Sequence, residues 1–235
     1  MKTFAIIVAF CVIFVLGTCT YYAPVEVRYR LTAEVMAGGK IYAGTGVIAS
    51  VFGNDPIPFS TRGSSYFRGE AVAVDVGELG TLFLLLAGRD KDGKPTSIAP
   101  GRRLLIPVLS PKLDRDTPGD NLDLGRAVAR VTPRKAEVPM EHIPFLVRFR
   151  DINNPKSVEA VVPNNLAAQF GEGTRLMRVM IELTDDPVTT GIEKRLPWLS
   201  AMKSVALDGQ RLRHFGKAET TANSLDYTNF KEGAQ

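Results

Sequence analysis

Hydrophobic and polar residues alternate without a break between residues 25 and 35. Every odd position from Val25 to Val35 is apolar, and every even position is polar or charged. Successive side chains of a β-strand point to opposite faces, so this pattern predicts a strand with one buried face. Gly38 and Gly39 supply a turn, and residues 40–52 are expected to return as the antiparallel partner.

The same reasoning predicts further strands. Residues 70–76 place three valines on one face, segment 77–80 forms a turn, and the continuous apolar run 81–87 completes a second hairpin. Other strands are predicted at 103–109, 128–131, 145–150, 157–162 and 175–183. One short helix is predicted at 164–170, and another begins after Thr190, where Glu193 completes a capping box and Pro197 ends the helix.

These elements predict a mainly β protein. The expected fold is either a β-sandwich or barrel-like structure, or an α+β structure with one antiparallel sheet. In each case an N-terminal hydrophobic helix and few short helices are expected. Residues 1–23 are a membrane anchor or signal segment, and 24–205 form a single β-rich domain. Residues 206–235 are polar and weakly patterned, and are expected to form a mobile tail. Residues 110–125, rich in Pro, Asp and Gly, are expected to form a long exposed loop.

The N-terminal segment is the most apolar part of the chain. After Lys2, residues 4–23 are all uncharged, and as a helix rising about 1.5 Å per residue they would span the roughly 30 Å hydrocarbon layer of a bilayer. Three interpretations stay open: an uncleaved anchor, a cleaved signal peptide, and a lipoprotein signal. In the third, Leu16-Gly17-Thr18-Cys19 resembles the bacterial lipobox, and Cys19 is the acylated residue. The domain is then expected to be anchored to a membrane and to face the periplasm or the cell exterior.

Composition and charge restrict the classes of function. The 235 residues are 45% hydrophobic and 23% charged, which is enough apolar material for a substantial core and excludes wholesale disorder. A net charge of +4 is too small and too dispersed to predict nucleic-acid binding. Because Cys11 and Cys19 are the only cysteines, the domain after residue 23 has no disulfide and no Cys-based zinc site.

The sequence has no local motif for catalysis, a metal ion or a nucleotide, so no cofactor, metal or catalytic residue is predicted. Scattered residues can still be assembled by a fold into a hydrolase-like site, for which the candidates are Asp151, Asp185, Glu193 and His142.

Two charged segments have a local interpretation. The run from Asp90 to Gly93 resembles the start of a calcium loop, but its lysines and the lack of a later glutamate favour a hairpin turn. A loose basic cluster, if it shares a face near a membrane, could attract anionic headgroups. Its members are Arg126, Arg130, Arg134 and Lys135, with Arg102 and Arg103 earlier in the chain.

Three segments carry a resemblance to a known family. They are Arg28-Tyr29-Arg30-Leu31-Thr32, the segment 149–159 that begins Phe149-Arg150-Asp151-Ile152, and the segment 184–199, which reads TDDPVTTGIEKRLPWL. With them the chain resembles an uncharacterised bacterial family of membrane-associated or exported proteins, in which a membrane segment precedes one small domain of unknown function. The resemblance implies a location in the cell envelope and no particular activity, substrate or cofactor.

The leading expectation is therefore a membrane-anchored protein of the bacterial envelope that acts as a non-enzymatic binding or structural module. Its expected partners are the membrane, through the N-terminus, and another envelope protein. Two alternatives are a hydrolase-like enzyme with the scattered acidic and histidine site, and a small-molecule or lipid carrier. A carrier needs a large apolar cavity.

Overall fold

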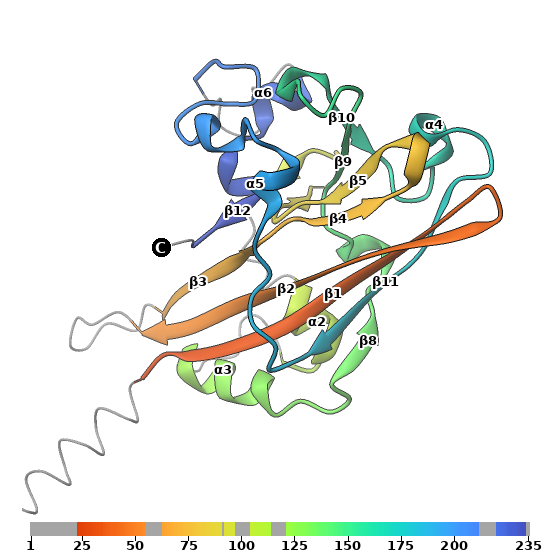
Figure 1. Ribbon diagram of the computed structural model, residues 1–235. Helices are drawn as coiled ribbons and strands as arrows, with labels where there is room; N and C mark the ends of the chain where they lie inside the picture. The colour runs from red at the N-terminus through yellow and green to blue at the C-terminus, as the bar shows by residue number, and fades with distance from the viewer. Residues whose placement is uncertain are drawn as a thin grey trace, which may run out of the picture.

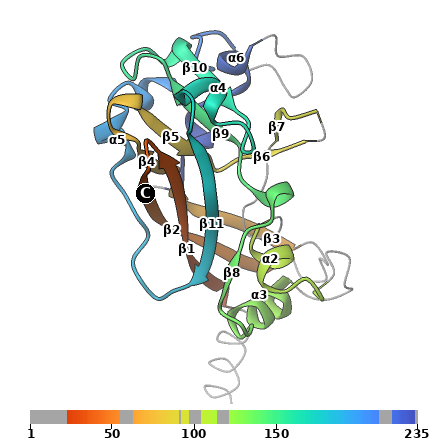
Figure 2. The same cartoon turned by 90° about the vertical axis from the view of Figure 1, so that its right-hand side faces the viewer.

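A computed structural model describes residues 23–54, 63–90, 92–96, 104–113, 121–211 and 220–233. Over these residues the protein is mainly β, with antiparallel sheets and few, short helices, as the sequence predicts (Figure 1). Figure 2 shows most of the short helices in two groups toward opposite ends of the molecule, with strands between them.

The larger sheet has the strand order β12-β3-β2-β1-β11-β8, and all neighbours are antiparallel. Its strands are β1 (Val25–Ala37), β2 (Lys40–Asn54), β3 (Gly63–Glu70), β8 (Lys135–Glu137), β11 (Arg175–Leu183) and β12 (Lys231–Glu232). The predicted alternation of β1 is confirmed, because its odd positions from Val27 to Val35 are buried and the polar positions between them are not. The first hairpin is also confirmed, with Gly38 and Gly39 at φ values of 54° and 77°.

A smaller sheet of order β10-β9-β5-β4 packs on the buried face of the larger one. Its strands are β4 (Val72–Asp75), β5 (Thr81–Leu84), β9 (Leu146–Phe149) and β10 (Val158–Val161). The turn between β4 and β5 is a 3-10 helix, η1 (Gly77–Leu79), so the predicted second hairpin is confirmed. A separate two-stranded hairpin pairs β6 (Gly88–Arg89) with β7 (Pro95–Thr96).

The two sheets approach most closely at two glycines of β2. A Cβ atom on Gly44 would overlap the backbone oxygen of Ala73, and one on Gly46 would lie 3.0 Å from Cγ2 of Val72. Residues without side chains at these two positions therefore allow β4 to cross β2.

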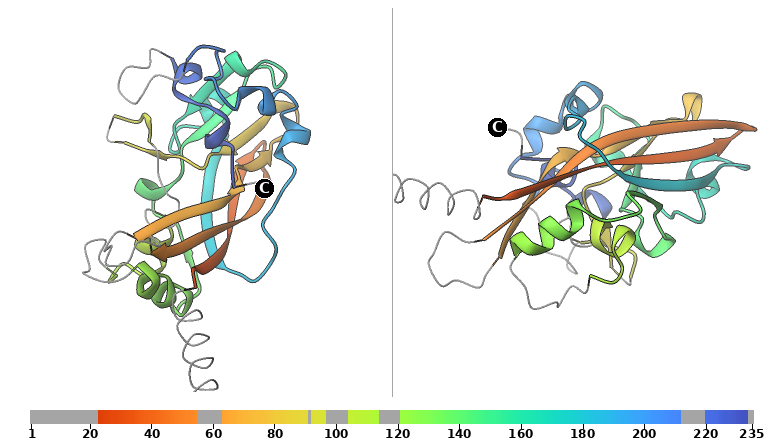
Figure 3. Two further views of the ribbon diagram at one scale, coloured as in Figure 1. Left: turned by 90° about the vertical axis from the view of Figure 1, so that its left-hand side faces the viewer. Right: turned by 90° about the horizontal axis from the view of Figure 1, so that it is seen from below.

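Two helices, α2 (Ile106–Leu109) and α3 (Asn121–Ala129), cover the buried face of the larger sheet near the beginning of β1 (Figure 3). The predictions of strands at 103–109 and 128–131 are wrong for the residues that the structure describes there. Of the loop predicted at 110–125, residues 110–113 do form a turn, but residues 121–125 belong to α3. Leu122, Gly125 and Val128 recur every three residues, which is the spacing of one helix face. Gly125 lets α3 approach β2, because a Cβ there would lie 2.7 Å from Cβ of Phe52.

The C-terminal part of the chain forms a cap over the far face of the smaller sheet. The cap contains α5 (Ile192–Arg195), η5 (Leu199–Met202), α6 (Thr221–Ser224) and η6 (Tyr227–Asn229). The predicted mobile tail at 206–235 is wrong for residues 206–211 and 220–233: Leu207, Leu225 and Phe230 are fully buried, and β12 pairs with β3. Isolated apolar residues between polar ones have no periodicity, so only the tertiary contacts reveal their burial.

Three short helical segments complete the structure: η3 (Met140–His142), η4 (Pro155–Ser157) and α4 (Ala167–Phe170). The predicted helix at 164–170 is confirmed as α4, which ends at Gly171 with a φ of 93°. The capping box predicted for Thr190 is wrong, because α5 begins after Gly191 and no side chain caps it.

In the described part of the chain, no helix is both long and apolar enough to cross a membrane. The run predicted as an anchor or signal lies outside the described residues, with Cys11 and Cys19, and so does His214.

Candidate functional site

The segment 184–191 crosses the outer face of the larger sheet and is called the strap (Figure 1). Two arginines of β1 hold its first residues. Arg28 Nη1 donates to the carbonyl oxygens of Asp185 and Asp186, at 2.8 and 3.0 Å. Arg30 donates to Thr184 Oγ1 at 3.2 Å and forms an ion pair with the Asp186 carboxylate. The RYRLT segment is thus in direct contact with the beginning of the TDDPVTTG segment.

The other end of the strap is tied to β2. The backbone N–H of Val47 donates to Thr189 Oγ1 at 2.9 Å, and the N–H of Thr189 donates to the Val47 carbonyl at 3.1 Å. Arginine side chains of β1 therefore hold one end of the strap and backbone groups of β2 hold the other, and these contacts fix the path of the chain from β11 to the cap.

Replacing Arg30 with alanine should loosen the strap without unfolding the domain. The variant loses a charge-assisted contact between Arg30, whose side chain is 31% exposed, and Asp186, whose side chain is 56% exposed. Because solvent screens such a pair, we expect the free energy of unfolding to fall by only about 1 kcal/mol. A proteinase that cuts beside aspartate should cleave at Asp185 or Asp186 faster than in the wild type. Arg178→Ala is the control, because Arg178 pairs with Glu34 on the same sheet and is not bonded to the strap. Equal cleavage rates in the two variants would show that Arg30 does not hold the strap.

A partly buried charge network lies where the strap enters the cap. Lys231 Nζ lies 2.6 Å from Glu193 Oε2 and 3.3 Å from Glu70 Oε1. Glu70 is only 4% exposed, and its Oε2 accepts a hydrogen bond from the backbone N–H of Ile192 at 2.7 Å. Ser200 Oγ donates to Glu193 Oε1 at 2.5 Å. The network joins β3, α5, η5 and β12.

The network shifts the protonation equilibria of its members. The hydrogen bond from Lys231, supported by that from Ser200, lowers the pKa of the Glu193 carboxyl. The hydrogen bond to Glu193 raises the pKa of the Lys231 ammonium, although burial opposes this. Both shifts favour the charged forms, so the ion pair persists at neutral pH. Next to it, burial raises the pKa of Glu232.

A cleft of about 410 Å³ opens beside this network and is called the charged cleft. It is lined by residues 68–70 at the end of β3, residues 188–190 of the strap, and residues 231–233 at the end of β12. Its walls carry cations from Arg68 and Lys231, and carboxylates from Glu70 and Glu232. A lining of this kind can bind a polar ligand through hydrogen bonds and charge, while the charge network keeps the walls in place.

The sequence did not reveal the two central residues of this site. Glu70 opens a predicted strand, and Lys231 lies in a segment with no periodicity. The one local sign that this segment is buried is the apolar residue Phe230 next to Lys231. Phe230 is fully buried in the cap.

Trp198 attaches the cap to the smaller sheet. Its Nε1 donates to the carbonyl oxygen of Ile152 at 2.7 Å, and its ring centroid lies 5.3 Å from that of Phe149 and 6.4 Å from that of Phe230. The segment 149–159 of the resemblance thus contacts the end of the segment 184–199, and all three segments join distant parts of the fold.

The four residues predicted for a scattered hydrolase site lie in separate local environments. Asp151 Oδ1 accepts from the backbone N–H of Asn153, and Asp185 is an exposed residue of the strap. Glu193 belongs to the charge network, and His142 ends a 3-10 helix. Within the described residues, no three His, Cys, Asp or Glu side chains form a group that could hold a metal ion.

The two charged segments interpreted from the sequence have distinct local structures. Asp90 Oδ1 accepts from the backbone N–H groups of Asp92 and Lys94, and the segment joins β6 to β7, which agrees with the hairpin interpretation. Of the basic cluster, Arg126 lies on α3, Arg130 follows it, and Arg134 and Lys135 lead into β8. Arg102 and Arg103 lie outside the described residues.

An apolar pocket between the two sheets tests the carrier alternative. It is lined by residues such as Tyr29, Ile48 and Leu86, with His142 and Pro144 beside it, but its volume is only about 40 Å³. That volume holds one or two water molecules and is far below the several hundred Å³ of a typical ligand pocket. This pocket does not fit a lipid or a drug-sized molecule.

Comparisons with protein-family models, with curated proteins and with solved structures find no match to this chain.

Proposed function

We propose that the protein is a membrane-anchored component of the bacterial envelope whose β-rich domain is a non-enzymatic binding module. An N-terminal hydrophobic helix formed by residues 4–23 is the proposed anchor, and the charged cleft is the proposed binding site. The partner is another envelope component with a polar surface. The uncharged N-terminal run supports the anchor, and the resemblance of the three segments supports the location.

The charge network beside the cleft is the observation that carries the binding role. Burying Glu70 and most of Lys231 costs desolvation energy, which apolar residues of similar size would avoid. Such an arrangement next to an open cleft is more typical of a functional site than of a packed core. Of the candidate acidic residues outside the network, Asp151 accepts a hydrogen bond within a local turn and Asp185 is exposed in the strap.

Fractionation of the tagged full-length protein tests the anchor. We expect the protein in the membrane fraction, and the Cys19→Ala variant should stay there if the run is an uncleaved helix. Incorporation of labelled fatty acid into the wild type but not into the Cys19→Ala variant would identify a lipoprotein signal instead. A wild-type protein found only in the soluble fraction contradicts the anchor.

A photo-crosslinking residue at Thr190 tests the cleft in the same cells. Thr190 is exposed in the cleft wall, and Lys156 is an exposed control position outside the cleft lining. A covalent adduct formed from Thr190 and absent from Lys156 is expected. Identical patterns from both positions would contradict a binding role for the cleft.

A further inference from the structure

We propose that the end of the larger sheet at which β1 begins lies against an anionic bilayer surface, and that Arg130 and Arg134 make the contact. This inference rests on the proposed function, because it requires the N-terminal run to be in the membrane. It adds an orientation: this end faces the lipid headgroups, and the cap faces away from them.

The connection to the anchor is very short. Pro24 is the only residue between the uncharged run 4–23 and Val25, the first residue of β1. One residue spans at most about 3.6 Å, so Val25 must lie within a few ångströms of the membrane interface.

The helix α3 is held beside this point. A Cβ atom on Gly125 would lie 3.1 Å from Cβ of Val25, so the middle of α3 packs directly on the first residue of β1. Figure 3 shows α3 beside the beginning of β1. The helix is therefore within about 8–10 Å of the headgroups, which is the distance over which exposed charges interact at physiological salt.

The segment that contains α3 carries more positive than negative charge. Segment 121–137 contains four cations and two anions, and Arg126 pairs with Asp123. Arg130 and Arg134 are exposed, and neither forms an ion pair with any described residue. The Arg134 carbonyl accepts from the N–H of Leu183 at 2.8 Å, which fixes this arginine beside the end of β11.

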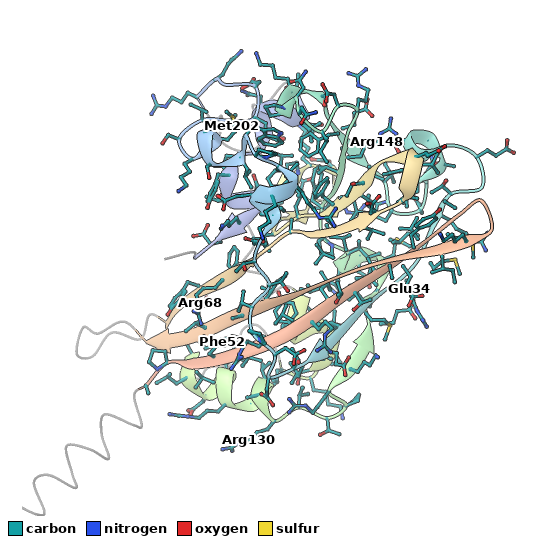
Figure 4. All side chains as sticks on the ribbon, viewed as in Figure 1. Glu34, Phe52, Arg68, Arg130, Arg148 and Met202 are labelled. Atoms are coloured by element: carbon teal, nitrogen blue, oxygen red, sulfur yellow. The ribbon has the colours of Figure 1, made fainter. Side chains whose placement is uncertain are left out.

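The geometry places the cap on the opposite side. In Figure 4, Arg130 lies at the end of the molecule near α3, and Met202 of the cap lies at the other end. Met202 and Trp198 pack against the same apolar cluster on the far face of the smaller sheet. Trp198 is the single tryptophan of the chain, so it serves as a natural probe of the membrane-distal end.

The test uses the full-length protein in vesicles that contain lipid with a spin-labelled headgroup, which quenches nearby tryptophan. A second probe is Ala127→Trp, at an exposed position of α3, in a Trp198→Phe background. In vesicles of phosphatidylglycerol and phosphatidylcholine we expect strong quenching of Trp at 127 and little quenching of Trp198 in the wild type. Circular dichroism checks that the variant is folded.

Charge reversal identifies the contacting residues. Arg130→Glu with Arg134→Glu, added to the probe, should reduce the quenching several-fold, because each arginine near an anionic surface favours the contact about fivefold. Lys156→Glu with Lys194→Glu changes the net charge equally at two exposed positions elsewhere, and should leave the quenching unchanged. In vesicles of phosphatidylcholine alone, the arginine variant and its parent should differ little.

Vesicle flotation separates the two levels of the proposal. If the protein does not float with vesicles, the anchor itself is wrong. If it floats but the probe at 127 is not quenched, or the arginine reversal behaves like the lysine reversal, the anchor stands and the proposed contact is wrong. Equal quenching at 127 and at Trp198 would overturn the orientation.

Discussion

Replacing Gly44 with valine should separate the two sheets and lower the free energy of unfolding by about 3 kcal/mol or more. The reason is that a Cβ at this position overlaps the backbone oxygen of Ala73, and a backbone atom cannot rotate away as a side chain can. Relief requires β4 to move away from β2, which opens the core that β1 and the smaller sheet share. Denaturant unfolding followed by circular dichroism measures the change.

Two neighbouring substitutions make the prediction specific. Ala43→Val adds similar bulk at an exposed position on the other face of β2 and should change stability by less than about 0.5 kcal/mol. Gly46→Ala brings a methyl group to 3.0 Å from a side-chain atom of Val72, which can shift, so its cost should fall between the other two. A Gly44→Val protein as stable as Ala43→Val would mean that the sheets do not meet here.

The strands of the protein could be predicted from the sequence wherever one face is buried and the other is exposed to solvent. The first hairpin is the clearest case, because alternation determines which face of β1 is buried and the two glycines determine the turn. The valines of β4 follow the same logic. β5 was predicted from a continuous apolar run instead, and it is buried on both faces. Strands predicted at 145–150, 157–162 and 175–183 correspond to β9, β10 and β11.

The sequence was misleading where apolar runs are short. The segment around Ile106 has no pattern long enough to distinguish a helix from a strand, and Pro107 is compatible with the first turn of a helix. In α3, Gly125 occupies the centre of the apolar face, and glycine does not favour a helix. The helix could therefore not be predicted from the sequence, and the role of this glycine is seen only in its close approach to Phe52.

The candidate site was hidden for a different reason. Glu70 and Lys231 are far apart in the sequence, and nothing local to either one indicates a buried ion pair. From the sequence, Glu193 was predicted to be a capping residue or an acid–base residue. In the structure it pairs with Lys231, which β12 places beside it. Ion pairs between remote segments depend on the topology of the sheet, which a single sequence does not determine.

Replacing Lys231 with methionine should lower the free energy of unfolding by about 3 kcal/mol, because it leaves the Glu70 carboxylate buried without its counter-charge. Methionine keeps most of the length of the side chain, so the loss reflects charge more than volume. Glu193 contributes less to the cost, because its side chain is 34% exposed and water can solvate it. Chemical denaturation at neutral pH measures the change, and Lys194→Met, at an exposed position on the same helix as Glu193, should be close to neutral.

The charge origin of this effect can be separated from packing in two ways. The double variant Glu70→Gln with Lys231→Met should recover most of the lost stability, because a neutral amide oxygen still accepts the hydrogen bond from Ile192.

The difference in stability between wild type and Lys231→Met should also depend on pH. Since the pKa of Lys231 is raised above its ordinary 10.5, its stabilisation is complete below that pH and is lost as pH rises through the folded value. Since the pKa of Glu193 is lowered below 4.5, its part is complete above that pH and is lost under more acidic conditions. The stability difference should therefore be flat between about pH 5 and 10 and shrink on both sides; a difference that does not vary with pH, or a double variant no more stable than the single one, would show that the lysine acts through its volume alone.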